Sequence, residues 1–148
     1  MNTESIRKSF KKSVAKSVEL YPREDNGYQI FTPFHFDDGD HFVVILKTDG
    51  LGNWIITDEG HTYMHISYDM DLSSLENGTR NEIIESSLDK YGVKEIEGRL
   101  VATVDEISNA GNTLYGFIQC LISITNISYL SRERVLSAFH EDSEKRKD

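Results

Sequence analysis

The first regular pattern of apolar residues lies near the N-terminus. The pattern places apolar side chains at intervals of four, which is the spacing of one face of an α-helix. The residues are Ile6, Phe10, Val14 and Val18. We therefore expect an amphipathic helix over residues 4–20, ending before Pro22, because proline is not compatible with a helix interior.

Short β-branched and aromatic runs separated by turn signals follow this helix. The three runs are GYQIFTPFHF, HFVVILKTD and WIITDEG, and the intervening turns are DDGD and GLGN. Runs of this length and composition are typical of strands, so we expect a three-stranded antiparallel meander. Pro33 indicates an edge position or a bulge in the first strand. The residues after Asp58 predict a short helix or turn.

The second half of the chain has two helical patterns around a β pattern. NGTRNEIIESSLDKYGV predicts a helix capped by Thr79, with Glu82 at the spacing of a capping box. KEIEGRLVATV predicts one or two strands, with Gly98 at a turn or bulge. A long helix is expected from Asp105, and its part after Leu114 is apolar on nearly every face. This helix should lie at the centre of the core.

The order of these elements predicts an α+β fold, with helices on one face of a mostly antiparallel sheet. A chain of 148 residues can bury a sizeable core without a disulfide or a structural metal. We expect one domain over residues 1–130 and a charged, frayed tail over 131–148. Pairing of the long helix with a second copy would make a homodimer.

Charge is distributed unevenly along the chain. The formal net charge is −9, which argues against direct nucleic-acid binding, since phosphate contacts need clustered Lys and Arg. Residues 1–20 carry five basic side chains against two carboxylates, whereas residues 37–76 carry nine carboxylates against Lys47. A single cysteine, Cys120, and an N-terminus without the apolar core of a signal peptide predict a cytoplasmic protein with no membrane partner.

Several short motifs follow one another in a distinctive order and spacing. They are Thr32, Pro33 and Phe34, then Gly39 and Asp40, then Thr57, Asp58 and Gly60, and finally Tyr91 and Gly92. In order and spacing, over residues 5–130, the chain resembles an uncharacterised bacterial and phage family, domain of unknown function 1828. The resemblance implies a prophage or mobile-element context, and a second domain in longer members, but it implies no activity.

Two interpretations of the carboxylates near WIITDEGHTYMHIS remain open. Asp58 can cap the next helix, with Gly60 at a positive φ. Alternatively, Asp58 and Glu59 could gather with Asp37, Asp38 or Asp40 and hold Mg²⁺ or Mn²⁺ for phosphodiester cleavage. The lysine that the commonest phage nucleases place after their second acid is missing here.

The paired histidines and other motifs give no further chemistry. His61 and His65 have zinc-ligand spacing, but a zinc site needs a third protein ligand. We therefore expect surface or cap histidines, no bound metal and no cofactor. No P-loop, dinucleotide-binding pattern or catalytic-serine motif is present in the sequence.

The acidic segment gives the leading functional hypothesis. Its carboxylates could be ordinary solvated loops, or they could imitate phosphates on the surface of a binding protein. We expect a small non-enzymatic protein-binding module that inhibits a host defence or nucleic-acid enzyme. The expected binding residues are Asp37, Asp38, Asp40, Asp58 and Glu59. The alternative is a divalent-metal nuclease that uses Asp40, Asp58 and Glu59. A third hypothesis is a purely structural or regulatory domain whose partner domain acts.

Overall fold

A computed structural model describes residues 1–76 and 78–145, with only the backbone described over 129–145. The predicted α+β class is confirmed. The elements are α1 (Thr3–Lys16), β1 (Glu19–Pro22), β2 (Tyr28–Phe31), β3 (Ile45–Thr48), β4 (Trp54–Thr57), α2 (His61–Ser67), α3 (Gly78–Tyr91), β5 (Val93–Ile96), β6 (Arg99–Val104) and α4 (Ala110–Lys145), with 3-10 turns at Leu72–Leu75 and Ile107–Asn109.

The six strands form one antiparallel sheet in the order β1-β2-β3-β4-β6-β5. The expected three-stranded antiparallel meander is confirmed as β2, β3 and β4. The sequence prediction missed β1, since residues 19–22 form a strand instead of the end of the first helix. The first predicted run also ends early. β2 lies between two strands and stops before Pro33, since proline has no N–H for the ladder of an inner strand.

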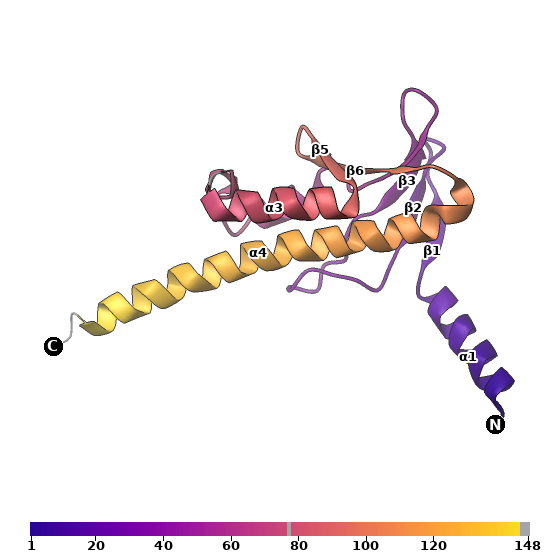
Figure 1. Cartoon of the computed structure of the whole chain (residues 1–148), viewed down its shortest axis with the longest axis horizontal. Coiled ribbons are helices and arrows are strands. Elements are labelled where there is room, and N and C mark those ends of the chain that lie inside the picture. Colours follow the sequence, from indigo (N-terminus) through magenta and orange to yellow (C-terminus); the bar gives the residue numbers. More distant parts are fainter. Residues whose placement is uncertain (77, 146–148) are drawn as a thin grey trace.

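α3 and α4 cover one face of this sheet (Figure 1). Leu46, Ile56 and Ala102 are aligned across β3, β4 and β6, so their side chains share a face, and all three are buried. Residues of α4 complete this core, with Phe117 and Leu121 fully buried. The prediction that the long helix is the central core element is therefore confirmed. Gly98 has a positive φ at the β5–β6 turn.

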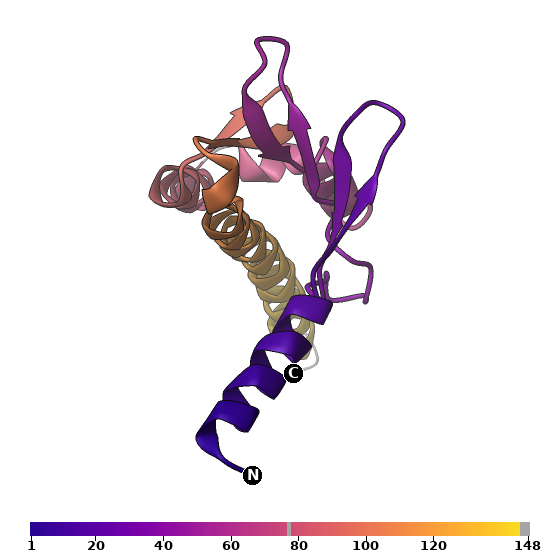
Figure 2. The ribbon, with the colours of Figure 1, turned by 90° about the vertical axis from the view of Figure 1, so that its right-hand side faces the viewer.

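α1 projects away from the sheet (Figures 1 and 2). It ends at Lys16 and has no buried residue. Three residues of the predicted apolar row, Ile6, Phe10 and Val14, lie on this helix and are 53%, 68% and 43% exposed. The fourth, Val18, follows the helix and packs against the core. Within the described part of the chain, no helix is both long and apolar enough to cross a membrane.

Besides the end of α1 at Lys16, the starts of α3 and α4 differ from the sequence prediction. α3 begins at Gly78, so Thr79 lies inside its first turn, and residue 77 is outside the described residues. α4 begins at Ala110 instead of Asp105, because a 3-10 turn precedes it. The backbone of α4 is helical to Lys145, and the fraying expected over residues 131–148 stays a prediction. Residues 146–148 lie outside the described residues, and the domain division at 130 stays a prediction.

We predict that Leu121→Ala lowers the free energy of unfolding by about 2–5 kcal/mol, because it removes a fully buried side chain and leaves a cavity. Chemical denaturation monitored by circular dichroism measures this change. Gln119→Ala is the matched control, since Gln119 is exposed on the same helix and its truncation should change stability by less than about 0.5 kcal/mol. Equal effects of the two substitutions would contradict the packing of α4.

Candidate functional site

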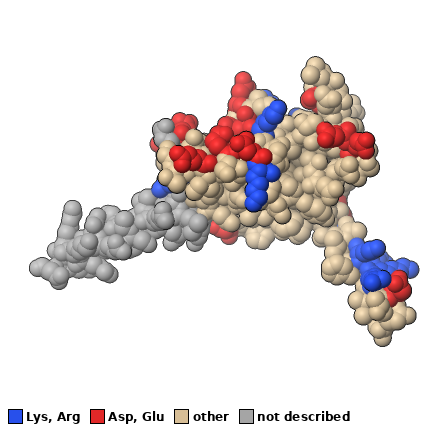
Figure 3. All heavy atoms as spheres, in the orientation of Figure 1, with Lys and Arg blue, Asp and Glu red and all other residues tan. Residues whose placement is uncertain are grey.

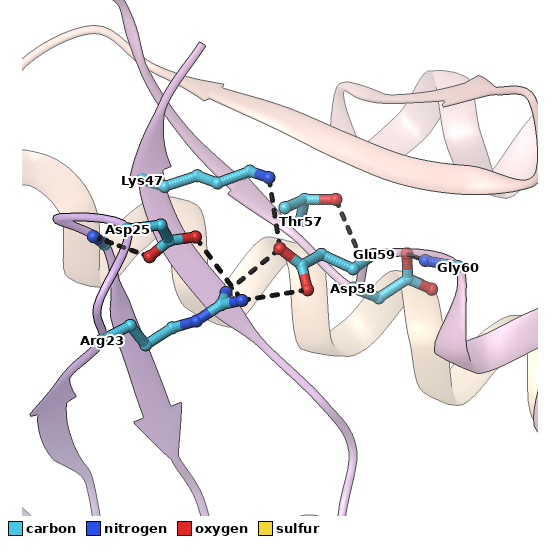
Figure 4. A network of polar contacts seen from close by, with 8 residues as sticks. Arg23, Asp25, Lys47, Thr57, Asp58, Glu59 and Gly60 are labelled. Atoms are coloured by element: carbon cyan, nitrogen blue, oxygen red, sulfur yellow. Dashed lines mark hydrogen bonds and ion pairs between the residues drawn. The ribbon is translucent and has the colours of Figure 1, made fainter.

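Asp58 is buried at the junction between β4 and α2, and its carboxylate accepts three backbone hydrogen bonds. Oδ1 accepts from the N–H groups of Gly60 and Leu100, both at 2.9 Å, and Oδ2 accepts from Thr62 at 3.1 Å. Figure 4 shows its contact with Gly60. The prediction that Asp58 caps the helix, with Gly60 at a positive φ, agrees with these contacts. Asp58 also ties α2 to β6.

Glu59, the next residue, belongs to a network of ion pairs (Figure 4). Its carboxylate lies 3.1 Å from Arg23, which follows β1, and 3.2 Å from Lys47 of β3. Burial alone would raise the pKa of Glu59, but hydrogen bonds from Arg23 and Lys47 outweigh it and lower this pKa. The hydrogen bond to Glu59 raises the pKa of Arg23. Glu59 is therefore a paired structural anion.

The remaining predicted carboxylates lie on a separate loop, residues 35–41, which we call the acidic loop. An isolated β-bridge between His35 and His41 closes it. Inside, Phe36 donates to the carbonyl of Asp40 at 2.8 Å, and Gly39 donates to that of Phe36 at 3.0 Å. Gly39 has φ +93°, a conformation that glycine adopts without strain. These contacts hold the loop as a defined turn.

α2 braces the acidic loop from inside through His65. The His65 ring stacks on buried Phe36, with centroids 3.8 Å apart and an interplanar angle of 11°. Its Nε2 lies 2.9 Å from Oδ2 of Asp38, and its Nδ1 lies 3.8 Å from Oδ2 of Asp40. The side chains of Asp38 and Asp40 are 54% and 73% exposed. The carboxylates of the loop are therefore exposed to solvent, while the contacts of Phe36 and Asp38 with His65 hold the loop in position.

Exposed apolar side chains lie beside these carboxylates. A hollow of about 370 Å³ includes Asp40 and His65 in its lining, together with Met64 and Tyr68 of α2 and the turn that follows it. Met64 and Tyr68 are 45% and 70% exposed. A second cavity, of about 270 Å³, is also lined by His65 and includes Asp37. The acidic loop therefore adjoins one mainly apolar cavity and one hollow with a mixed polar and apolar lining.

The structure divides the predicted residues into two groups. Asp37, Asp38 and Asp40 lie on the acidic loop, whereas Asp58 and Glu59 are engaged at the β4–α2 junction. Among the described residues, the converging group of potential metal ligands includes Asp40 but neither Asp58 nor Glu59. The use of Asp40, Asp58 and Glu59 together by a nuclease stays a prediction.

His65 is the functional residue whose position the sequence prediction missed. We expected a surface or cap histidine, but its side chain is only 17% exposed. Among the described residues, the structure finds one group of at least three potential metal ligands whose ligand atoms converge, within 4.8 Å of one another: Asp38, Asp40 and His65. In the sequence, only the spacing of His61 and His65 indicated that His65 could belong to a site. No sequence pattern indicated the roles of Phe36, which stacks on His65, and of Arg23, which pairs with Glu59.

Comparisons with known proteins place the chain in a family. The model of a family described as Domain of unknown function DUF1828 matches residues 32–124. The resemblance predicted from the sequence motifs is therefore confirmed over these residues. A search of curated proteins found no match, and a search of solved structures found none.

We predict that Asp58→Ala lowers the free energy of unfolding by at least about 2 kcal/mol, because the buried N–H of Leu100 loses its acceptor. Asp49→Ala is the matched control, since Asp49 also accepts two backbone hydrogen bonds, but in an exposed turn where water can replace it. Urea denaturation measures both. An Asp58→Ala protein as stable as Asp49→Ala would show that the buried bonds contribute little.

We predict that Glu59→Gln lowers the free energy of unfolding at pH 7 by roughly 0.5–1 kcal/mol. The lowered pKa of Glu59 means that its charge stabilises the fold above its ordinary pKa of about 4.3. This contribution disappears as the pH falls through the folded-state value. Denaturation at pH 7 and pH 3 should therefore show a difference from wild type only at pH 7.

The control for this substitution is Glu97→Gln. Glu97 is 85% exposed and pairs with Arg99 at 3.8 Å, so its substitution should change stability little at either pH. A loss of stability for Glu59→Gln that is as large at pH 3 as at pH 7 would contradict a role for the carboxylate charge.

Proposed function

We propose, since this chain belongs to the DUF1828 family, that it is a non-enzymatic protein-binding module whose acidic loop recognises a basic partner. The partner class that fits is a host nucleic-acid enzyme, including one used in defence, which the module would inhibit by occupying a groove meant for phosphates. The single observation that carries this proposal is the acidic loop, with three exposed carboxylates held on a braced turn.

Rigidity supports recognition because a preformed surface loses little conformational freedom on binding. The His35–His41 bridge, the internal hydrogen bonds and the stack of Phe36 on His65 all fix the loop before any partner arrives. Asp37 and Asp40 thus point their charges outward at set positions. A solvated loop that only increased solubility would not need this bracing.

The surroundings of the loop also suit a protein interface. Aromatic and methionine side chains are enriched in interfaces, and Phe34, Met64 and Tyr68 are all partly exposed near the loop. They could supply apolar contacts, while the carboxylates set the orientation and the rate of association. A partner surface with Lys or Arg around an apolar patch would complement both features.

The charge distribution favours a basic partner. In Figure 3, Lys and Arg gather on α1 and in one band on the body, while Asp and Glu occupy several areas of the body. The net charge of −9 would attract a basic protein over a distance and repel nucleic acid. The phage or mobile-element setting that the family resemblance implied would explain why the target is a host enzyme. The nuclease alternative would need Asp58 and Glu59, which among the described residues are outside the converging group of potential metal ligands.

We predict that replacing Asp37, Asp38 and Asp40 together with Asn reduces capture of a basic partner at least fivefold, because the attraction from three charges is lost. Tagged protein is incubated with bacterial lysate in buffer with EDTA, and bound proteins are quantified by mass spectrometry. Capture by the wild type should weaken with added salt, since screening acts over about 10 Å at 0.1 M ionic strength.

The matched control replaces Glu82, Glu85 and Asp89 on α3 with Gln, Gln and Asn. These side chains are exposed, so the net charge changes equally while the acidic loop stays intact. The control should capture the same protein as the wild type. If the loop variant captured the same protein as well as the wild type does, and salt had no effect, the proposal would be contradicted. The loop carboxylates would then be ordinary solvated side chains.

A further inference from the structure

The geometry points to a zinc site formed by Asp38, Asp40 and His65. This inference stands on the convergence of one imidazole and two carboxylates, and it does not depend on the proposed protein partner. From the sequence we expected no zinc site, because His61 and His65 had no third protein ligand beside them. The fold supplies the missing ligands from the acidic loop, 25 or more positions earlier in the chain.

The combination of ligand atoms favours Zn²⁺ over the hard cations. Mg²⁺ and Ca²⁺ select sites made of oxygen ligands, whereas imidazole nitrogen with carboxylate oxygen suits Zn²⁺. Zinc sites that keep an open position use three protein ligands and a water. The high exposure of Asp40 leaves space for that water.

The histidine is already held in position for coordination. Its ring is fixed by the stack on Phe36 and lies edge-on to Tyr68, with centroids 5.9 Å apart. His65 is mostly buried, so the ring nitrogen would lose little freedom on binding a metal. This held nitrogen donor distinguishes the cluster from an ordinary group of surface carboxylates.

Only small movements are needed to complete the site. Bonds of about 2.0–2.1 Å in a tetrahedral arrangement place ligand atoms about 3.3 Å apart. Nε2 of His65 and Oδ2 of Asp38 are 2.9 Å apart, so they would separate slightly as the metal replaces the hydrogen bond between them. The ligand atom of Asp40 lies within 4.8 Å of the other two, and an exposed side chain can rotate over that distance.

The same helix offers a matched control in His61. This residue lies one turn before His65 and lines the same hollow of about 370 Å³. Among the described residues, His61 has no carboxylate partner. Substitution of His61 therefore removes an imidazole from the same surface without touching the proposed ligands.

The test is calorimetric titration of Zn²⁺ into the full chain after removal of metals with EDTA and dialysis. We expect one Zn²⁺ per chain, an affinity at least tenfold weaker in His65→Ala and in Asp40→Asn, and an affinity within twofold of wild type in His61→Ala. Mg²⁺ should give no binding heat. Absence of zinc binding in the wild type, or equal binding by wild type and His65→Ala, would overturn the proposal.

Cobalt substitution gives a second readout that does not depend on stability. Co²⁺ in a four-coordinate site absorbs visible light strongly, so the wild type and His61→Ala should develop this band and Asp38→Asn should not. Circular dichroism verifies that each variant is folded, and Asp40→Asn covers the case in which His65→Ala loses the stack on Phe36. Because partner capture is measured in EDTA, failure of the zinc site leaves that result standing, and the reverse also holds.

Discussion

The carboxylate of Asp58 joins three parts of the chain that the sequence keeps apart. It accepts hydrogen bonds from the N–H of Gly60 in the turn after β4, from that of Thr62 in the first turn of α2 and from that of Leu100 in β6. A buried carboxylate is costly unless hydrogen bonds compensate its charge, and three backbone donors do so here. The direction in which α2 leaves the sheet follows from these bonds.

That direction determines what the neighbouring surface can do. α2 carries His65 to the inner side of the acidic loop, where the ring stacks on Phe36 and meets Asp38. Glu59 pairs instead with cations from the β1–β2 region and from β3. Two adjacent carboxylates therefore perform different structural tasks, and the carboxylates that remain available to a ligand lie on the acidic loop.

The two proposals concern the same loop and bear on each other. Zn²⁺ bound by Asp38 and Asp40 would cancel most of the negative charge that attracts a basic partner. Occupancy by metal and capture of the partner would then oppose each other, since a ligand shifts an equilibrium only through its different affinity for two states. His65 connects the two events because it contacts both carboxylates.

Local pattern was sufficient to predict the α+β class, the amphipathic α1, the apolar α4 and the helix-capping role of Asp58, because each depends on spacing within a few residues. The extra strand β1 and the end of β2 before Pro33 depended on which strands are neighbours in the sheet. The approach of Asp38 and Asp40 to His65 also required the tertiary structure. The acidic loop and His65 are distant in sequence, and they come together only because the packing of α2 on the sheet fixes their relative positions. No periodicity along the chain indicates how close they lie.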